Sequence, residues 1–402
     1  FKTLLDENKE RLARTLSQEV GKPVQQALNE LNAMPGRIDF FLANAASVLA
    51  DEVVQQDPVE ERIGWEPLGV VANISAWNYP YFVGSNVFVP ALLTGNAVVY
   101  KPSEFAALTG LAITELLHSA GVPADVFQAL IGGGAIGAAL LQEPVDAVFF
   151  TGSYATGRRI AEAVAGRLVK VQLELGGKDP AYVTDDVDVA VAADSLSDGA
   201  FYNTGQSCCA VERIYVHEAV AGPFIEKFVA AVKSFNVGDP GEKTTYIGPL
   251  TREAQLAVLE DQVTDAVARG AELITGGKRM ARPGYYFEPT VLVNATSAMK
   301  VMRDESFGPI IGIQVVKSDD EAARLMNDTD YGLTAGVYSK SRQRAERILR
   351  AVQSGSVYWN CCDRVSPRLP WTGRRHSGIG STLSTHGIRA FVQPKAWHLR
   401  AG

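Results

Sequence analysis

Apolar residues in the first part of the chain recur at the spacing of an amphipathic helix. Leu12, Leu16 and Val20 stand four residues apart, and charged or polar residues fill most of the gaps between them. Because a helix completes one turn every 3.6 residues, this spacing places the three side chains on one face. We therefore predict helical structure over residues 1–48 and a β-hairpin over the more polar residues 51–66.

From Leu68 onward, short runs rich in β-branched and aromatic residues alternate with longer helical runs. Such alternation is typical of a parallel sheet that helices cover on both faces. The first set predicts strands at 70–74, 97–100, 127–131, 147–150 and 169–173, with helices at 105–120 and 156–165. A second set predicts strands at 213–216, 310–316 and 335–338, with helices near 219–234 and 252–269. We expect two α/β lobes that join near residues 174–210, and one more strand at 396–400.

Composition and charge exclude several classes of protein. The chain has 402 residues, 47% hydrophobic and 21% charged, which is ordinary for a globular protein large enough for two cores. A net charge of −7 repels a phosphate backbone, so we expect no nucleic-acid partner. No uninterrupted apolar run reaches the roughly 20 residues of a membrane helix. The start at Phe1 does not resemble a secretion signal, and because a helical pattern is already running there, we expect the native chain to begin earlier.

The four cysteines form two adjacent pairs, Cys208-Cys209 and Cys361-Cys362. Neighbouring cysteines rarely bridge each other, so we expect free thiols in a reducing compartment, the cytoplasm. A zinc site built from all four thiolates is disfavoured, because paired ligands usually have two to four residues between them. We therefore expect no bound metal.

Three side chains are candidates for the chemistry of an acyl transfer. Cys208 lies among small polar residues in 203–209, where a stabilised thiolate would be a nucleophile; an inert buried cysteine is the alternative. Glu174 follows an apolar strand, and burial would suit it to general-base work unless it pairs with Lys178 on a loop. Asn78, in an aromatic turn, offers an N–H donor for an oxyanion, or it simply closes the turn.

Several loops at the ends of predicted strands could bind a nucleotide. Glycine-rich turns occupy 131–137 and 150–157, and the spacing of Gly132, Gly134 and Gly137 fits the dinucleotide fingerprint, but no acidic partner follows at the expected distance. Taken singly, these are interpreted as tight turns. Lys101-Pro102-Ser103-Glu104 ends a strand, and Glu104 could hold both hydroxyls of a ribose. The stretch 305–309 leads into a strand.

Together, these motifs resemble the aldehyde dehydrogenase superfamily over residues 1–396. Residues 201–208 look like the family's cysteine signature, and residues 174–178 look like its glutamate signature. The resemblance implies that Cys208 is the nucleophile and that Asn78, with the backbone N–H of Cys208, forms the oxyanion hole. It also implies that Glu174 activates the water that hydrolyses a thioester.

The resemblance implies a two-part binding site as well. The residues expected to bind NAD are Ile74, Ser75, Trp77, Lys101, Ser103, Glu104, Gly132, Gly137, Phe150, Thr151, Gly152, Ser153, Leu175, Glu305 and Phe307. The residues expected in the pocket for the aldehyde substrate are Tyr79, Ser207, Cys209 and Trp371. Because Glu104 would repel a 2′-phosphate, NAD is expected to be preferred over NADP.

The implied fold is an α/β fold with a Rossmann-type parallel sheet. Residues 1–50 and 67–174 would form the NAD-binding domain, 175–375 a second α/β catalytic domain, and 51–66 with 390–402 a small β element for oligomerisation. A homodimer or homotetramer is expected. A CoA-acylating enzyme and a non-catalytic ligand-binding protein are the alternatives; the first is disfavoured by Glu174 and the second by the intact set of motifs.

The substrate pocket is expected to be mostly apolar. Tyr79, Trp371 and the Cys361-Cys362 loop suggest an aromatic-lined tunnel, which favours an aliphatic or aromatic aldehyde over an anionic semialdehyde. Trp371 stands where the family has another aromatic residue, and the cysteine pair is expected to be core. One inward-pointing arginine among Arg364, Arg374 and Arg375 would reverse the inference about charge.

Overall fold

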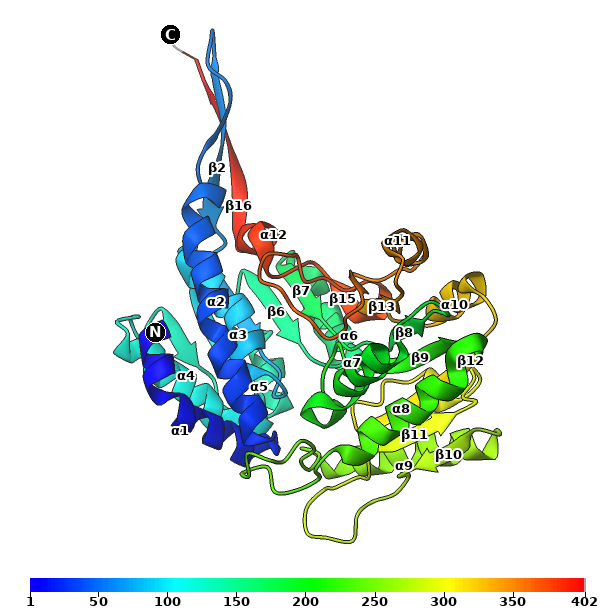
Figure 1. Ribbon diagram of the computed structural model, residues 1–402. Helices are drawn as coiled ribbons and strands as arrows, with labels where there is room; N and C mark the ends of the chain where they lie inside the picture. The colour runs from blue at the N-terminus through cyan, green and yellow to red at the C-terminus, as the bar shows by residue number, and fades with distance from the viewer. Residues whose placement is uncertain (401–402) are drawn as a thin grey trace.

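A computed structural model describes residues 1–400, and its strands form three separate sheets (Figure 1). The first sheet has the order β15-β7-β6-β3-β4-β5 and is parallel except for β15, which runs antiparallel to β7. Its strands are β3 (Val70–Ile74), β4 (Ala97–Lys101), β5 (Phe127–Ala129), β6 (Ala147–Thr151), β7 (Lys170–Glu174) and β15 (Gly378–Ile379). Around this sheet lie α1 (Lys2–Val20), α2 (Val24–Val48), α3 (Pro80–Leu93), α4 (Ala107–Ser119), α5 (Gly134–Leu140), α6 (Tyr154–Val164) and α12 (Ser384–Arg389).

The second sheet has the order β10-β11-β12-β9-β8-β13-β14 and is parallel except at β10. Its strands are β8 (Asp179–Val183), β9 (Val211–His217), β10 (Glu272–Thr275), β11 (Thr290–Val293), β12 (Ile310–Val316), β13 (Thr334–Tyr338) and β14 (Ser356–Trp359). Its helices are α7 (Val189–Phe201), α8 (Ala221–Ser234), α9 (Glu253–Ala268), α10 (Asp319–Met326) and α11 (Arg342–Arg350). Two largely parallel sheets with covering helices confirm the predicted α/β class.

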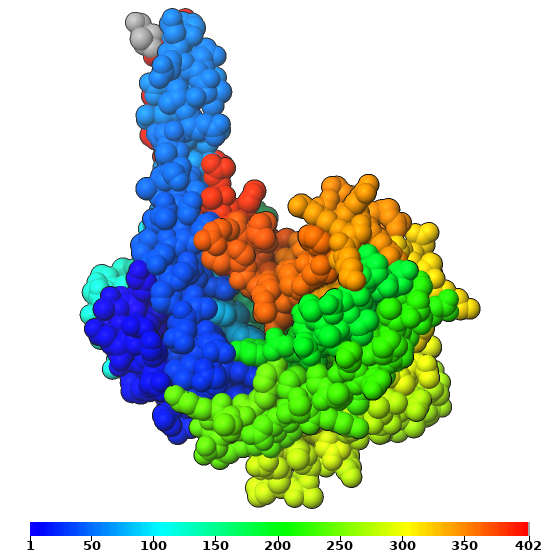
Figure 2. All heavy atoms as spheres, in the orientation of Figure 1, coloured from blue at the N-terminus to red at the C-terminus, as the bar shows by residue number. Residues whose placement is uncertain are grey.

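The third sheet is an arm that projects from the body of the molecule (Figures 1 and 2). It consists of β1 (Glu52–Gln55), β2 (Glu60–Pro67) and β16 (Val392–Leu399), all antiparallel. The hairpin predicted at 51–66 and the strand predicted near the C-terminus therefore pair with each other. Residues 401 and 402, the end of the predicted oligomerisation element, lie outside the described residues.

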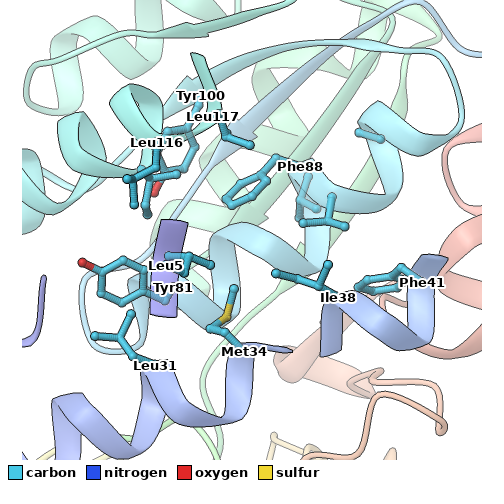
Figure 3. Packing of buried hydrophobic residues seen from close by; sticks show 14 of the residues in the cluster. Leu5, Leu31, Met34, Ile38, Phe41, Tyr81, Phe88, Tyr100, Leu116 and Leu117 are labelled. Carbon is cyan, nitrogen blue, oxygen red and sulfur yellow. The ribbon is translucent and has the colours of Figure 1, made fainter. Parts of the chain in front are cut away.

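The helices at the N-terminus pack on the first sheet through one apolar core. Leu12, Leu16 and Val20 are buried there, as the helical spacing predicts. Figure 3 shows α1 and α2 contributing Leu5 and Met34 opposite Tyr81 and Phe88 of α3. This packing brings one face of α2 beside α3 and the carboxyl ends of the strands.

Several elements differ from the predictions. The predicted helical region at 1–48 is broken at Gly21, which adopts a left-handed φ of 74° and caps α1. The strand predicted at 127–131 ends at Ala129. Helix α3 was not predicted, because it is apolar on nearly every face and contains Pro90, so it shows no amphipathic period. Within residues 1–400, every helix is too short or too polar to cross a bilayer.

Candidate active site

Two cavities meet at Cys208. The sheet-edge cavity, of about 720 Å³, lies against the carboxyl ends of the strands of the first sheet, and its lining includes Ile74, Lys101 and Thr151. The tunnel cavity, of about 650 Å³, lies between α2, α3 and the loop at 363–371. Cys208 and Thr151 line both cavities. A reagent in one cavity can therefore meet a reagent in the other at this sulfur.

A left-handed turn presents Cys208 to the cavities. After α7, the backbone of Asn203, Thr204 and Gly205 has φ values of 54°, 59° and 70°. Glycine is needed at the last position, because a Cβ on Gly205 would lie 2.3 Å from the carbonyl oxygen of Gly308. The turn leaves Cys208 half-buried at the junction of the cavities.

Asn78 is buried next to this turn. Its Nδ2 donates a hydrogen bond to the carbonyl oxygen of Gln206 over 3.0 Å, and Asn203 Nδ2 donates to the same oxygen over 3.0 Å. Asn78 and Cys208 both line the sheet-edge cavity. The amide thus stands beside the loop that carries the sulfur, where a donor for an oxyanion is needed.

Glu174 ends β7 and lines the tunnel cavity together with Cys208. Its carboxylate accepts hydrogen bonds from Thr382 Oγ1, from Gln172 Nε2 over 3.2 Å and from Thr151 Oγ1 over 3.5 Å. Burial outweighs these bonds and raises the pKa of Glu174 to about 7. The alternative of an ion pair with Lys178 is absent, because Lys178 Nζ lies 2.6 Å from Glu212 instead.

The residues predicted to bind NAD gather in the sheet-edge cavity with one exception. Those that line it are Ile74, Ser75, Trp77, Lys101, Ser103, Glu104, Gly137, Phe150, Thr151, Gly152, Ser153, Leu175, Glu305 and Phe307. Gly132 does not line it, whereas Gly134 does. Gly132 has a φ of 153°, and a Cβ there would lie 2.4 Å from the side chain of Ile136, so this glycine serves the turn before α5.

The cavity offers the hydrogen-bonding groups that a dinucleotide needs. Ser153 caps α6, so free backbone N–H groups and the positive end of the helix dipole face the cavity. Gly152 lines the cavity without a side chain, so a ligand can approach its backbone closely. A larger residue would not fit there, since a Cβ would lie 2.4 Å from the ring of Phe150. The carboxylate of Glu104, with its side chain 48% exposed, lies 3.9 Å from Lys101 Nζ, where ribose hydroxyls could bind.

A buried ion pair holds the segment that contains Glu305 and Phe307. Glu212 accepts hydrogen bonds from the backbone N–H groups of Ser306 and Phe307, over 2.8 and 2.9 Å, and pairs with Lys178. Phe307 has a left-handed φ of 47°, and its ring meets Trp77 edge to face at 5.6 Å. Burial, with Glu212 nearby, raises the pKa of Glu305 to about 8.

The residues predicted for the substrate, Tyr79, Ser207, Cys209 and Trp371, all line the tunnel cavity. Cys209 is buried and its thiol donates to Asp363 over 2.9 Å, which distinguishes it from Cys208. Neither Cys361 nor Cys362 is in the tunnel lining; Cys362 packs in the core beside α7, while Cys361 is half-buried.

Sequence reasoning missed several lining residues. Those on α2 are Gln26, Asn29, Glu30, Ala33, Gly36 and Arg37; others are Asp198, Tyr202, Asp363 and Arg368 in the tunnel, and Arg159 in the sheet-edge cavity. The polar positions of α2 have the pattern of a solvated helix face, so the pattern alone gives no sign that they line a cavity. Arg159 had one local signal, because it follows the glycine-rich turn at 150–157 on the first turns of α6.

Comparisons with known proteins agree with this geometry. The sequence pattern of the aldehyde dehydrogenase family matches residues 1–397. The peroxisomal aminoaldehyde dehydrogenase 1 of Pisum sativum is 35% identical over 399 residues, which cover 97% of this chain and 79% of the relative. The chloroplastic betaine aldehyde dehydrogenase of Atriplex hortensis is 34% identical over 402 residues, which cover 97% of this chain and 80% of the relative.

Solved structures agree as well. An NAD-dependent aldehyde dehydrogenase from Sinorhizobium meliloti superimposes with a TM-score of 0.97 at 34% identity, covering 100% of this chain and 80% of that chain. The chain therefore belongs to the aldehyde dehydrogenase family. It is an enzyme that oxidises aldehydes with NAD(P) as coenzyme, as the sequence motifs predicted.

Proposed function

We propose that this enzyme converts an aldehyde to a free carboxylic acid through a thioester on Cys208, with Asn78 as oxyanion donor and Glu174 as general base. The observation that carries the proposal is the position of Cys208, which lines both cavities, with Asn78 in one lining and Glu174 in the other. Nucleophile, oxyanion donor and base thus converge on one reacting carbon.

The residues perform the reaction in two stages. The Cys208 thiolate forms a C–S bond with the aldehyde carbon, and the oxygen that becomes negative accepts a hydrogen bond from Asn78 Nδ2. Bound nicotinamide supplies the acceptor for the hydride that leaves this carbon, and a thioester remains. Glu174 then takes a proton from water while the water oxygen attacks the acyl carbon, and the C–S bond breaks to release carboxylic acid and thiolate.

The direct test compares two cysteine variants. Cys208→Ala should abolish aldehyde-dependent NADH formation, whereas Cys361→Ala, which removes a half-buried thiol outside both cavity linings, should retain it. Turnover by the Cys208 variant at the wild-type rate would refute the nucleophile assignment. Product analysis with and without CoA distinguishes the alternative, since the hydrolytic enzyme releases free acid in both cases.

We propose that the coenzyme is NAD rather than NADP. The carboxylate of Glu104 can accept both ribose hydroxyls and repels a 2′-phosphate. Arg159 also lines the cavity, and its positive charge would reduce the preference for NAD over NADP. The measurement is the ratio of kcat/KM for NAD and NADP, and a ratio in favour of NADP would contradict the proposal.

We propose further that the three sheets delimit the expected domains and that the arm mediates a homodimer or homotetramer. Strand β1 is exposed along its whole length, β2 is mostly half-buried, and the arm projects from the body, as a pairing element would (Figure 2). A monomeric mass by light scattering would count against assembly.

The four free thiols support a reducing compartment, proposed to be the cytoplasm, and fractionation of cells tests this location.

A further inference from the structure

The tunnel cavity contains a buried arginine that the proposed reaction does not use. Arg37 lies on α2, is 4% exposed and lines the cavity that Cys208 and Glu174 also line. Its Nη1 donates to Asn86 Oδ1, its guanidinium carbon lies 4.2 Å from the centre of the Phe82 ring, and its Nε is buried without an acceptor. A buried guanidinium with a spare donor is costly unless an anion completes it.

Two further arginines line the same cavity. Arg364 and Arg368 lie on the loop at its mouth and are exposed, and the side chain of Arg364 donates only to the adjacent carbonyl of Asp363. Among residues 1–400, none of these three guanidinium groups forms an ion pair; Glu30 and Glu174 act on Arg37 only from a longer range, and burial lowers its pKa to about 10. Arg374 and Arg375 do not line the tunnel.

The carboxylates of the tunnel, in contrast, already have partners. Glu30 pairs with Lys22 over 2.6 Å, Asp198 accepts from the hydroxyl of Tyr246 over 2.5 Å, and Asp363 accepts from the thiol of Cys209 over 2.9 Å. Burial raises the pKa of Asp363, and it raises the pKa of Glu174 to about 7. Within residues 1–400, none of these carboxylates accepts a hydrogen bond from Arg37 Nε, which stays a buried donor without a partner.

From this unmatched donor we propose that the preferred substrate is an aldehyde with a carboxylate at its far end, which Arg37 binds inside the tunnel while Arg364 and Arg368 attract it from the exposed loop. The three arginines line the tunnel cavity and not the sheet-edge cavity, so they face the tail of the aldehyde and not the coenzyme. A guanidinium and a carboxylate form strong, directional hydrogen bonds. The inference rests on the proposed reaction at Cys208.

Three aldehydes of similar length and different charge test the substrate class. These are 4-oxobutanoate, pentanal and 4-aminobutanal, each assayed at saturating NAD. The expected order of kcat/KM is 4-oxobutanoate first, pentanal second and 4-aminobutanal last. A preference for pentanal or 4-aminobutanal, the kind of cationic aldehyde that the names of the aminoaldehyde relatives indicate, would overturn the inference.

Variants assign the preference to Arg37. Arg37→Gln should lower kcat/KM for 4-oxobutanoate about tenfold or more relative to that for pentanal, through KM. The part of the loss that comes from a higher pKa of Glu174 should be the same for both aldehydes. Arg37→Lys, which keeps the charge, should restore part of the loss. Arg14→Gln, on the exposed face of α1, is the control and should change nothing. An equal loss for all three aldehydes in Arg37→Gln would show a merely structural role and overturn the assignment.

Two further measurements separate this inference from the reaction itself. Arg364→Gln, at an exposed position that does not endanger folding, should lower kcat/KM for 4-oxobutanoate several-fold at low salt and less at high salt. Succinate should raise the melting temperature of the wild type, and 1,4-butanediol should not; the effect should vanish in Arg37→Gln. If succinate protects and no aldehyde is oxidised, the proposed reaction fails and the anion site stands. If aldehydes are oxidised without regard to charge and succinate does not protect, the reaction stands and the anion site fails.

Discussion

Replacing Glu174 with glutamine should separate the two stages of the reaction. Glutamine keeps the size of the side chain and its contacts with Thr382 and Gln172, but it cannot accept a proton. General-base catalysis is worth about 10²–10⁴-fold in rate. The variant should therefore release one equivalent of NADH in a burst at nearly the wild-type rate and then turn over about 10²–10⁴ times more slowly.

The raised pKa fixes the pH dependence of the second stage. Burial raises the pKa of Glu174 from 4.5 to about 7, so the fraction of ionised base rises through neutral pH. When hydrolysis of the thioester limits the rate, the steady-state turnover of the wild type should rise with pH up to about 7 and stay constant above it. Glu174→Gln should lose this rise.

The same pKa shift predicts an effect on stability. The folded protein holds the Glu174 proton more tightly than the unfolded chain does, so ionisation between pH 4.5 and about 7 costs the folded state stability. The rise of the Glu174 pKa from 4.5 to about 7 corresponds to about 3 kcal/mol. Wild type and Glu174→Gln should therefore have similar stabilities near pH 4, and the variant should be more stable by up to about 3 kcal/mol at pH 8.

Thermal melting at a series of pH values, together with rapid-quench kinetics, measures both effects. Glu143→Gln, which changes an exposed carboxylate, is the control and should show neither. The reasoning is refuted if Glu174→Gln turns over at the wild-type rate, or if its gain in stability is the same at pH 4 and pH 8.

Other variants test the remaining parts of the site. Asn78→Ala should lower kcat about 10²–10³-fold with little change in coenzyme affinity, because it removes one oxyanion donor; stopped-flow measurement of the burst would show a slowed first stage. Glu104→Gln should raise the kcat/KM for NADP relative to that for NAD, since the charge that repels the 2′-phosphate is gone; an unchanged ratio in steady-state assays would contradict the role of Glu104. Glu212→Gln should weaken NAD binding measured by calorimetry and lower the melting temperature, because it leaves Lys178 buried without its counter-charge and loosens the segment at Glu305; unchanged NAD affinity would argue against this positioning role.

The sequence predicted those parts of the site that depend on local signals. Cys208, Glu174 and Asn78 each stand in a short motif, and the residues at the carboxyl ends of β3, β4 and β6 share a cavity because parallel strands end at one edge of a sheet. Gly132 does not line that cavity, and spacing alone does not distinguish a glycine in the turn before a helix from one that faces a ligand.

The parts that were not predicted depend on contacts between distant segments. Arg37 reaches the tunnel only because α2 packs on α3, and Asp363 meets Cys209 from far along the chain. A charged residue on an amphipathic helix has the same local pattern whether it faces solvent or a cavity, so the place of Arg37 in the tunnel could be read only from the folded structure.

Trapping the acyl group is the most direct test of the central claim that Cys208 carries the substrate during the reaction. Glu174→Gln is incubated with an aldehyde and NAD, quenched in acid, digested, and its peptides are fragmented by mass spectrometry. One acyl group is expected, at the sulfur of Cys208, with Cys209 unmodified. Acylation at Cys209 or at another residue, or no acylation while NADH is formed, would contradict it.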